Sequence, residues 1–324
     1  MNRAFQFFKE WILPIAMVVG ATSYGIYAAI PWPMAVRHFA AEAVSVIQPS
    51  LLFLMLFLTF CRVEPRDLKI RRWHWVMLAL QLCFFGATAA LLVCFPETPM
   101  RPLIESAMLC LLCPTATAAA VVTMKLGGSA ASMTTYTLMM NLAVALFAPL
   151  LLPLAHPQEG MTFLPAFIAI ITRVFPLLIF PLGIAWALRR IWPRAHKACA
   201  DAAGVAFYLW ACSLTLAIAV TTKAMVHEQT NPWLQVSIAL IALICCLGQF
   251  LYGWRLGARH GERIEGGQAF GQKNTIFIIW LGYTFLSPIT TLAGGFYCVW
   301  QTVVNGLQLY KQERQKRQSL PTSL

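Results

Sequence analysis

Long apolar runs, separated by short polar or proline-bearing links, dominate this sequence. An α-helix of about 20 mostly apolar residues is what the hydrocarbon core of a bilayer requires of a spanning segment. We predict ten such helices, at residues 11–31, 41–61, 74–95, 102–125, 129–154, 161–188, 203–223, 233–254, 264–286 and 289–310. The sequence therefore predicts an all-α membrane protein with ten transmembrane helices.

Composition excludes a water-soluble globule. Hydrophobic residues make up 59% of the chain and charged residues only 11%, whereas a soluble domain carries about 25% charged residues. The apolar excess has to face lipid, so the bilayer is the first expected partner. The net charge of +12 does not indicate nucleic-acid binding, because the basic residues lie in clusters between the apolar runs.

The positions of lysine and arginine predict how the chain crosses the membrane. With a cytoplasmic N-terminus, nineteen of the 24 basic residues fall on the cytoplasmic side and three on the outer side. Arg173 and Lys273, the other two, lie inside predicted spans. Since cytoplasmic loops are enriched in basic residues, we predict a multi-pass protein of the cell (inner) membrane with both termini in the cytoplasm.

Ten spans divide into two halves of five, residues 1–158 and 159–324. Because five is odd, the halves enter the membrane from opposite sides, which is the inverted-repeat arrangement of many secondary transporters. The fourth span is interrupted at Cys113–Thr117 and the ninth at Gly266–Thr275. Interruptions in matching positions of two halves point to a binding site at the middle of the membrane.

The chemistry of such a break favours an anion. The second half of a broken helix presents free N–H groups and the positive end of its dipole. We expect Thr115 and Thr117 to cap the second half of the fourth helix, and Asn274 and Thr275 to do so in the ninth. A plain proline kink or a glycine hinge is the alternative for either break alone.

Lys273 is the most unusual residue of the sequence. A lysine in the middle of a membrane helix costs roughly 2.5–3.5 kcal/mol and usually faces a cavity or a partner. The alternative is a ninth helix that begins later and leaves Lys273 at the membrane interface. The candidate neighbours and pocket residues are polar groups of the same break and of other spans, namely Gln81, Gln249, Gln272, Gln301 and Thr302.

No catalytic or metal-binding pattern is visible in the sequence. The histidines fall in or near predicted loops, and no paired carboxylates, nucleophile–base set or phosphate loop converges on one place. Most cysteines lie inside apolar runs without zinc-ligand spacing, where a thiol behaves as a small hydrophobe. We therefore expect no enzyme, no cofactor and no metal site.

Short motifs at the two interruptions resemble those of the bile acid:sodium symporter family. They are Cys-Pro-x-x-Thr-Ala at 113–118, Gly-x-x-Asn at 271–274, a Val-Trp pair at 299–300, and Gln81. The resemblance covers nearly the whole chain in span order and length. It implies panel helices within 11–61 and 161–223, core helices within 74–154 and 233–310, and a crossing of the fourth and ninth helices at their breaks.

The departures from the family pattern concern sodium. The resemblance implies transport of bile acids, pantoate-like acids and related organic anions, coupled to sodium. Positions that supply side-chain sodium ligands in the family are occupied here by Ala119, Ala120, Met133 and Ala269, and only Thr137 remains. A methyl group offers no oxygen ligand, and the ammonium of Lys273, at a family glutamine position, repels a nearby cation.

We therefore predict alternating-access transport of a small organic anion, a bile-acid-like or pantoate-like carboxylate, independent of sodium. Lys273 takes the place of the bound cation, with Gln81, Thr137 and Gln272 as further coupling or cavity residues. A desolvated lysine that releases its proton during transport would add protons as a partner; a uniporter or exchanger is the simpler version. The alternatives are a sodium-coupled symporter and a membrane sensor that binds its ligand without moving it.

Overall fold

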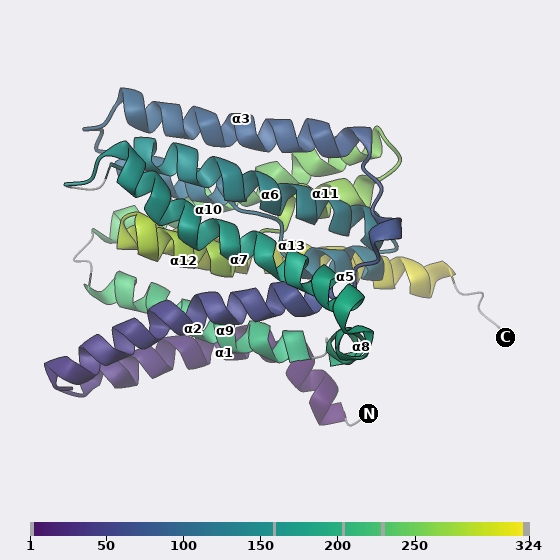
Figure 1. The fold of residues 1–324 in the computed structure, drawn as a ribbon, viewed down its shortest axis with the longest axis horizontal. Helices are drawn as coiled ribbons and strands as arrows, with labels where there is room; N and C mark the ends of the chain where they lie inside the picture. The colour runs from purple at the N-terminus through teal and green to yellow at the C-terminus, as the bar shows by residue number, and fades with distance from the viewer. Residues whose placement is uncertain (1–2, 158–159, 203–204, 228–230, 320–324) are drawn as a thin grey trace.

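The structure is a computed structural model that describes residues 3–157, 160–202, 205–227 and 231–319. Within these residues the secondary structure is helical, without a β-strand. The long helices lie side by side along the long axis of the molecule (Figure 1), so that α1 begins and α13 ends at the same end of the bundle.

The helices follow the apolar runs of the sequence. The first half of the chain contains α1 (Arg3–Ala29), α2 (Met34–Phe60), α3 (Arg72–Cys94), α4 (Arg101–Leu112), α5 (Ala118–Lys125) and α6 (Ala130–Ala155). The second half contains α7 (Phe163–Ile191), α8 (Pro193–Asp201), α9 (Val205–His227), α10 (Pro232–Ala258), α11 (Arg263–Gly271), α12 (Thr275–Phe285) and α13 (Thr291–Ser319). Short 3-10 helices, η1 (Pro65–Asp67) and η3 (Pro288–Thr290), lie in two of the links.

The predicted boundaries differ most from the observed ones at the two ends of the chain and at the start of α2, which begins at Met34, seven residues before the predicted start at 41. Helix α1 begins eight residues before the predicted start at 11, and α13 continues nine residues past the predicted end at 310. The continuation of α13 is rich in Lys, Gln, Glu and Arg, which are good helix formers without being apolar. A hydropathy criterion therefore ends such a helix too early.

Helix α8 lies where the sequence predicts only a link. Pro193 opens it at the first helical position, where a missing N–H is tolerated. The helix is nine residues long and none of its residues is buried. It lies at the end of the bundle where α1 begins (Figure 1).

Six helices in the described residues are long and apolar enough to cross a membrane: α2, α3, α6, α7, Tyr208–Val226 of α9, and α10. Ile15–Ala29 and Thr275–Phe285 are shorter apolar helices. Many large apolar side chains of these helices are exposed on the surface, which fits a lipid environment rather than water. The chain thus has the helical architecture of a multi-pass membrane protein.

The helices pack in two groups. Helix α1 packs on α9, α9 on α2, and α2 on α7, whereas α3, α4, α6, α10, α11, α12 and α13 pack mainly on one another. Helices α6 and α7 connect the two groups. The largest cluster of buried apolar side chains extends from α2 through α3, α4 and α6 to α12.

The glycines of the ninth predicted span are used for helix packing. Gly266 and Gly267 lie inside α11, and the helix is interrupted only at residues 272–274, so the prediction of a break beginning at Gly266 is wrong. A methyl group on Gly253 of α10 would collide with the carbonyl group of Gly266. The two backbones approach so closely that only glycine fits.

We predict that Gly253→Ala destabilises the protein, because the added methyl group pushes α10 away from α11. Overpacking of this kind costs about 1–3 kcal/mol, which a melting curve of the purified protein in detergent will detect. Gly248→Ala is the matched control on the same helix, since a methyl group there meets no atom within 4 Å. Equal melting temperatures for the two variants would contradict the assigned contact.

Candidate functional site

The two interrupted helices meet at their breaks. Residues 113–117 separate α4 from α5, and residues 272–274 separate α11 from α12. The amide N–H of Ala116 donates to the carbonyl of Gln272 (3.0 Å), and that of Asn274 donates to the carbonyl of Pro114 (2.9 Å). Thr115 and Lys273 thereby form an isolated antiparallel β-bridge. We call this region the crossing.

The sequence explains why α4 ends at the crossing. Pro114 has no N–H to donate and clashes with the preceding turn of a helix. Cys113 accordingly adopts an extended backbone (φ −53°, ψ 134°). Two of the backbone groups in this break, the carbonyl of Pro114 and the N–H of Ala116, pair with the other break.

The predicted caps are correct for one residue only. The side chain of Asn274 accepts a hydrogen bond from the N–H of Phe277 (3.2 Å) and caps α12. Thr117 occupies the N-cap position of α5 but forms no side-chain cap bond, and Thr115 donates instead to the carbonyl of Ala269 in α11 (2.9 Å). Thr275 is the first residue of α12 and is buried, with the cap coming from Asn274.

Lys273 lies wholly inside the protein. Its side chain is 0% exposed, so the alternative of an interfacial lysine is wrong. Among the described residues, the ammonium has no hydrogen-bond acceptor, and its Nζ lies 5.3 Å from the centroid of the Phe270 ring. The backbone N–H of Lys273 donates to Oε1 of Gln301 (2.8 Å), which brings the last helix to the crossing as predicted.

Four thiols are the electrostatic neighbours of this ammonium: Cys110, Cys113, Cys245 and Cys246. The first two belong to the end of α4 and the break that follows it, and the other two belong to α10. The ammonium therefore lies near the carboxyl end of α4, the negative end of that helix dipole. Sequence reasoning treated these cysteines only as apolar residues and missed their position.

Gln81 is bound to the end of α4. Its Nε2 donates to the carbonyl groups of Leu111 (2.8 Å) and Cys113 (3.0 Å). The hydroxyl of Tyr136 donates to Oε1 of the same glutamine (3.2 Å). Gln81 thus satisfies carbonyl groups that α4 leaves open at its end.

A glutamine–tyrosine pair of the second half makes related contacts. Nε2 of Gln249 donates to the carbonyl of Cys110 (3.3 Å) and to the hydroxyl of Tyr297 (3.2 Å). The hydroxyl of Tyr297 donates to the carbonyl of Gly271, the last residue of α11 (2.8 Å). Sequence reasoning found Gln249 as a neighbour but missed both tyrosines, because an isolated tyrosine in an apolar run gives no spacing signal.

The remaining predicted residues are only partly brought together. The carbonyl of Gln272 takes part in the bridge, and its Oε1 is buried without a partner among the described residues. Thr137 donates to the carbonyl of Met133 and Thr302 to that of Cys298, both within their own helices. These two threonines bond locally, so the structure gives no contact that ties them to the crossing.

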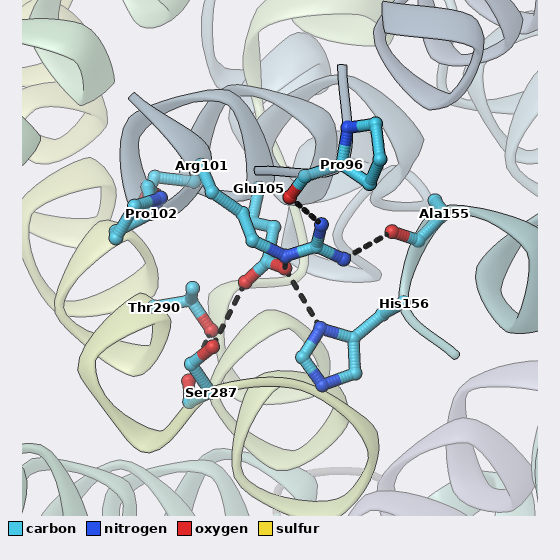
Figure 2. Close-up of polar contacts among 9 residues, drawn as sticks. Pro96, Arg101, Pro102, Glu105, Ala155, His156, Ser287 and Thr290 are labelled. Atoms are coloured by element: carbon cyan, nitrogen blue, oxygen red, sulfur yellow. Dashed lines mark hydrogen bonds and ion pairs between the residues drawn. The ribbon is translucent and has the colours of Figure 1, made fainter. Parts of the chain in front are cut away.

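A buried carboxylate fixes one end of the crossing helices. Glu105 of α4 accepts hydrogen bonds from Nε of Arg101 (3.0 Å) and the hydroxyl of Ser287 (3.0 Å), and bonds Nδ1 of His156 (2.7 Å). Arg101 also donates to the carbonyl of Ala155 (2.7 Å). Figure 2 shows these side chains converging on Glu105 from α4, from the end of α6 and from the link before α13.

Two further carboxylates, Glu262 and Glu265, fix the crossing helices at their other end. Glu265 of α11 accepts from the backbone N–H of Ser129, the N-cap residue of α6 (2.5 Å). Glu262 pairs with Arg71 and accepts from Nε1 of Trp73 (2.9 Å) and the hydroxyl of Ser132 (2.7 Å). These contacts tie the beginnings of α3, α6 and α11 together.

The sequence matches no known protein-family model and no curated protein. The resemblance to the bile acid:sodium symporter family therefore stays an expectation drawn from short motifs.

We predict that Gln81→Leu destabilises the protein, because it strips two buried carbonyl groups and a tyrosine hydroxyl of their partner. A buried polar group left unpaired costs about 1–3 kcal/mol. Gln48→Leu is the control: Gln48 is equally buried, but its Nε2 has no partner among the described residues. A melting temperature lowered as much by Gln48→Leu as by Gln81→Leu would contradict the capping role.

Proposed function

We propose that this chain is a secondary transporter that moves a small organic anion by alternating access, without sodium. The observation that carries the proposal is the Lys273 side chain, fully buried at the crossing of two interrupted helices without an acceptor among the described residues. A buried ammonium without a partner is costly. Such a group is retained where its charge has a use.

The proposal includes ten membrane-crossing helices in two inverted repeats, residues 1–158 and 159–324. Counting α4 with α5 and α11 with α12, and leaving out the short α8, which has no buried residue, the two broken helices are the fourth and the ninth of ten. The placement of α1 and α13 at one end of the bundle (Figure 1) supports an even number of crossings.

Matching side chains of the two halves support the inverted repeat. Each half supplies a glutamine from its third helix and a tyrosine from its fifth helix to the crossing, Gln81 with Tyr136 and Gln249 with Tyr297. Each half also supplies a buried carboxylate from the first part of its broken helix. This carboxylate bonds to the link that precedes the fifth helix of the other half. Glu105 reaches Ser287, and Glu265 reaches Ser129.

The four helix ends at the crossing explain why a fixed positive charge belongs there. The amino ends of α5 and α12 are positive, and the carboxyl ends of α4 and α11 are negative. The positive ends are the part that an anionic cargo can use, whereas the negative ends call for a cation. Lys273, with its ammonium near the carboxyl end of α4, supplies that cation from the chain itself.

Two of the positions that carry sodium ligands in the family that the sequence resembles offer nothing to sodium here. Ala119 and Ala269 are fully buried at the crossing, and their methyl groups supply no oxygen ligand. The carbonyl of Ala269 already accepts the hydroxyl of Thr115. Because the ammonium is enclosed, its charge acts on a cargo anion through space in this conformation, rather than by direct contact.

Alternating access requires one group of helices to move as a unit against the other. The contacts of Glu105 in α4, and of Glu262 and Glu265 at the start of α11, hold one group of elements together. This group consists of α3, α4, α6, α11 and the link before α13. Helices α1, α2, α7 and α9 form the other group. We propose that the crossing is carried past this second group during transport.

Uptake of radiolabelled pantoate and benzoate into proteoliposomes tests the proposal. We expect equal uptake in sodium and potassium buffers, and a loss of at least about tenfold, or 1.4 kcal/mol, in Lys273→Gln. Lys273→Arg is expected to keep part of the rate because it keeps the charge, and Lys311→Gln, at an exposed site on α13, is the control.

Two outcomes would favour the alternatives. Sodium-stimulated uptake that survives Lys273→Gln would reject the fixed cation and favour a sodium-coupled symporter. Saturable binding of either acid without any uptake into the vesicles would favour a sensor that does not transport.

A further inference from the structure

A cavity of about 190 Å³ lies between α1, α2, α9 and α12, at a distance from the crossing. Three tyrosines line it, Tyr24 and Tyr27 from α1 and Tyr283 from α12. Two basic residues complete the lining, Arg37 from α2 and Lys223 from α9, and no acidic residue contributes to it. The rest of the wall is mostly alanine and other small or apolar residues.

Among the described residues, no carboxylate neutralises the two positive charges at this cavity. Neither Arg37 nor Lys223 forms an ion pair among the described residues. Nζ of Lys223 lies 5.9 Å from the centroid of the Tyr283 ring, and the rings of Tyr24 and Tyr27 lie 6.2 Å apart. Basic groups beside aromatic rings in an otherwise apolar cavity recognise an anion that carries an apolar ring.

The size of the cavity limits the ligand. A volume of 190 Å³ equals that of roughly six water molecules in the liquid and lies below the roughly 300–1,000 Å³ of sites for drug-sized ligands. A single ring with one carboxylate fits such a volume, whereas a four-ring steroid acid does not. Of the two substrate classes expected from the sequence, the smaller one therefore fits this volume better.

The position of Tyr283 connects the cavity to the crossing. Tyr283 lies eight residues beyond Thr275, the first residue of α12, which corresponds to about 12 Å along the helix axis. A ligand in the cavity therefore touches the same half-helix whose amino end faces the crossing. With both termini in the cytoplasm, this part of α12 lies toward the outer surface.

We propose that the cavity is an outer capture site for a single-ring aromatic carboxylate of the benzoate class. Arg37 and Lys223 bind the carboxylate, and the tyrosine rings contact the aromatic ring. That the bound acid goes on to be transported rests on the proposed function, whereas binding of the acid to the cavity is measurable without transport.

Binding of radiolabelled benzoate to the protein in phosphatidylcholine nanodiscs tests the site. We expect saturable binding that the double variant Arg37→Gln, Lys223→Gln weakens at least about tenfold, since a charge-assisted contact is worth at least that factor. Benzyl alcohol, which lacks the charge, and 9-anthracenecarboxylate, which is too large, should not compete.

Four further variants guard against unfolding and non-specific effects. Arg37→Lys and Lys223→Arg keep the charge and should bind benzoate within about threefold of the wild type. Ala219→Trp fills the cavity without removing a charge and should abolish binding. His38→Gln, next to Arg37 but outside the cavity lining, should leave binding unchanged. Binding that survives both the double variant and Ala219→Trp would overturn the proposal.

Two more measurements distinguish binding at this cavity from binding of a lipid and from the role of the crossing. Benzoate binding should persist in nanodiscs that contain phosphatidylglycerol; its loss there would assign the cavity to a lipid phosphate and overturn the proposal. Lys273→Gln should lower uptake at least about tenfold and leave benzoate binding intact, so a failure of transport and a failure of capture give different results.

Discussion

The backbone groups released at two helix interruptions are what the rest of this structure has to satisfy. In a bilayer such groups cannot turn to water, and each one left unpaired costs several kcal/mol. The breaks therefore bond to each other through Ala116 and Asn274. Gln81 and Tyr297 reach in from two other helices to cap the carbonyl ends of α4 and α11.

Lys273 carries the charged group at the crossing that, among the described residues, these hydrogen bonds do not satisfy. Its ammonium stands beside the carboxyl end of α4, among thiols and the ring of Phe270. Thiols and rings are polarisable but weak partners for a charge. The field of this ammonium is therefore only weakly compensated nearby. A charge of this kind is part of the chain, whereas a metal ion acts only while it is bound.

A built-in cation also changes what can drive transport. A transporter that binds sodium with its cargo gains the energy of the sodium gradient. A chain with a covalently attached ammonium has no such ion to release, so the anion moves down its own gradient or in exchange for another anion. Release of the lysine proton during each cycle is the one route by which the same residue would couple to a gradient.

The sequence predicted the long helices, though not α8, because membrane helices are set by long apolar runs. It also predicted that the fourth and ninth spans are interrupted, although the second break is shorter than predicted, because breaks are set by Pro114 and by polar residues such as Asn274. It also predicted that Lys273 is not at the surface. The contacts within the crossing were harder to predict. Thr115 bonds to α11 instead of capping α5, and the partners of Gln249 depend on how α10 and α13 pack.

Other misses have a similar cause. Gly266 belongs to a helix contact rather than to a break, because a glycine fits both and only the neighbouring helix decides between them. The cavity beside Arg37 and Lys223 brings together residues from four helices that are distant in the sequence. Spacing along the chain carries no signal for such a site.

Thermal unfolding of the wild-type protein in sodium and in potassium, at constant ionic strength, tests the central claim most directly. Sodium that binds the folded state at a hundred times its dissociation constant would stabilise it by about 2.7 kcal/mol. If the ammonium of Lys273 already takes the place of the cation, the melting temperature will be the same in both salts. A melting temperature that rises specifically with sodium would show that a metal ion, and not the lysine, supplies the positive charge at the crossing.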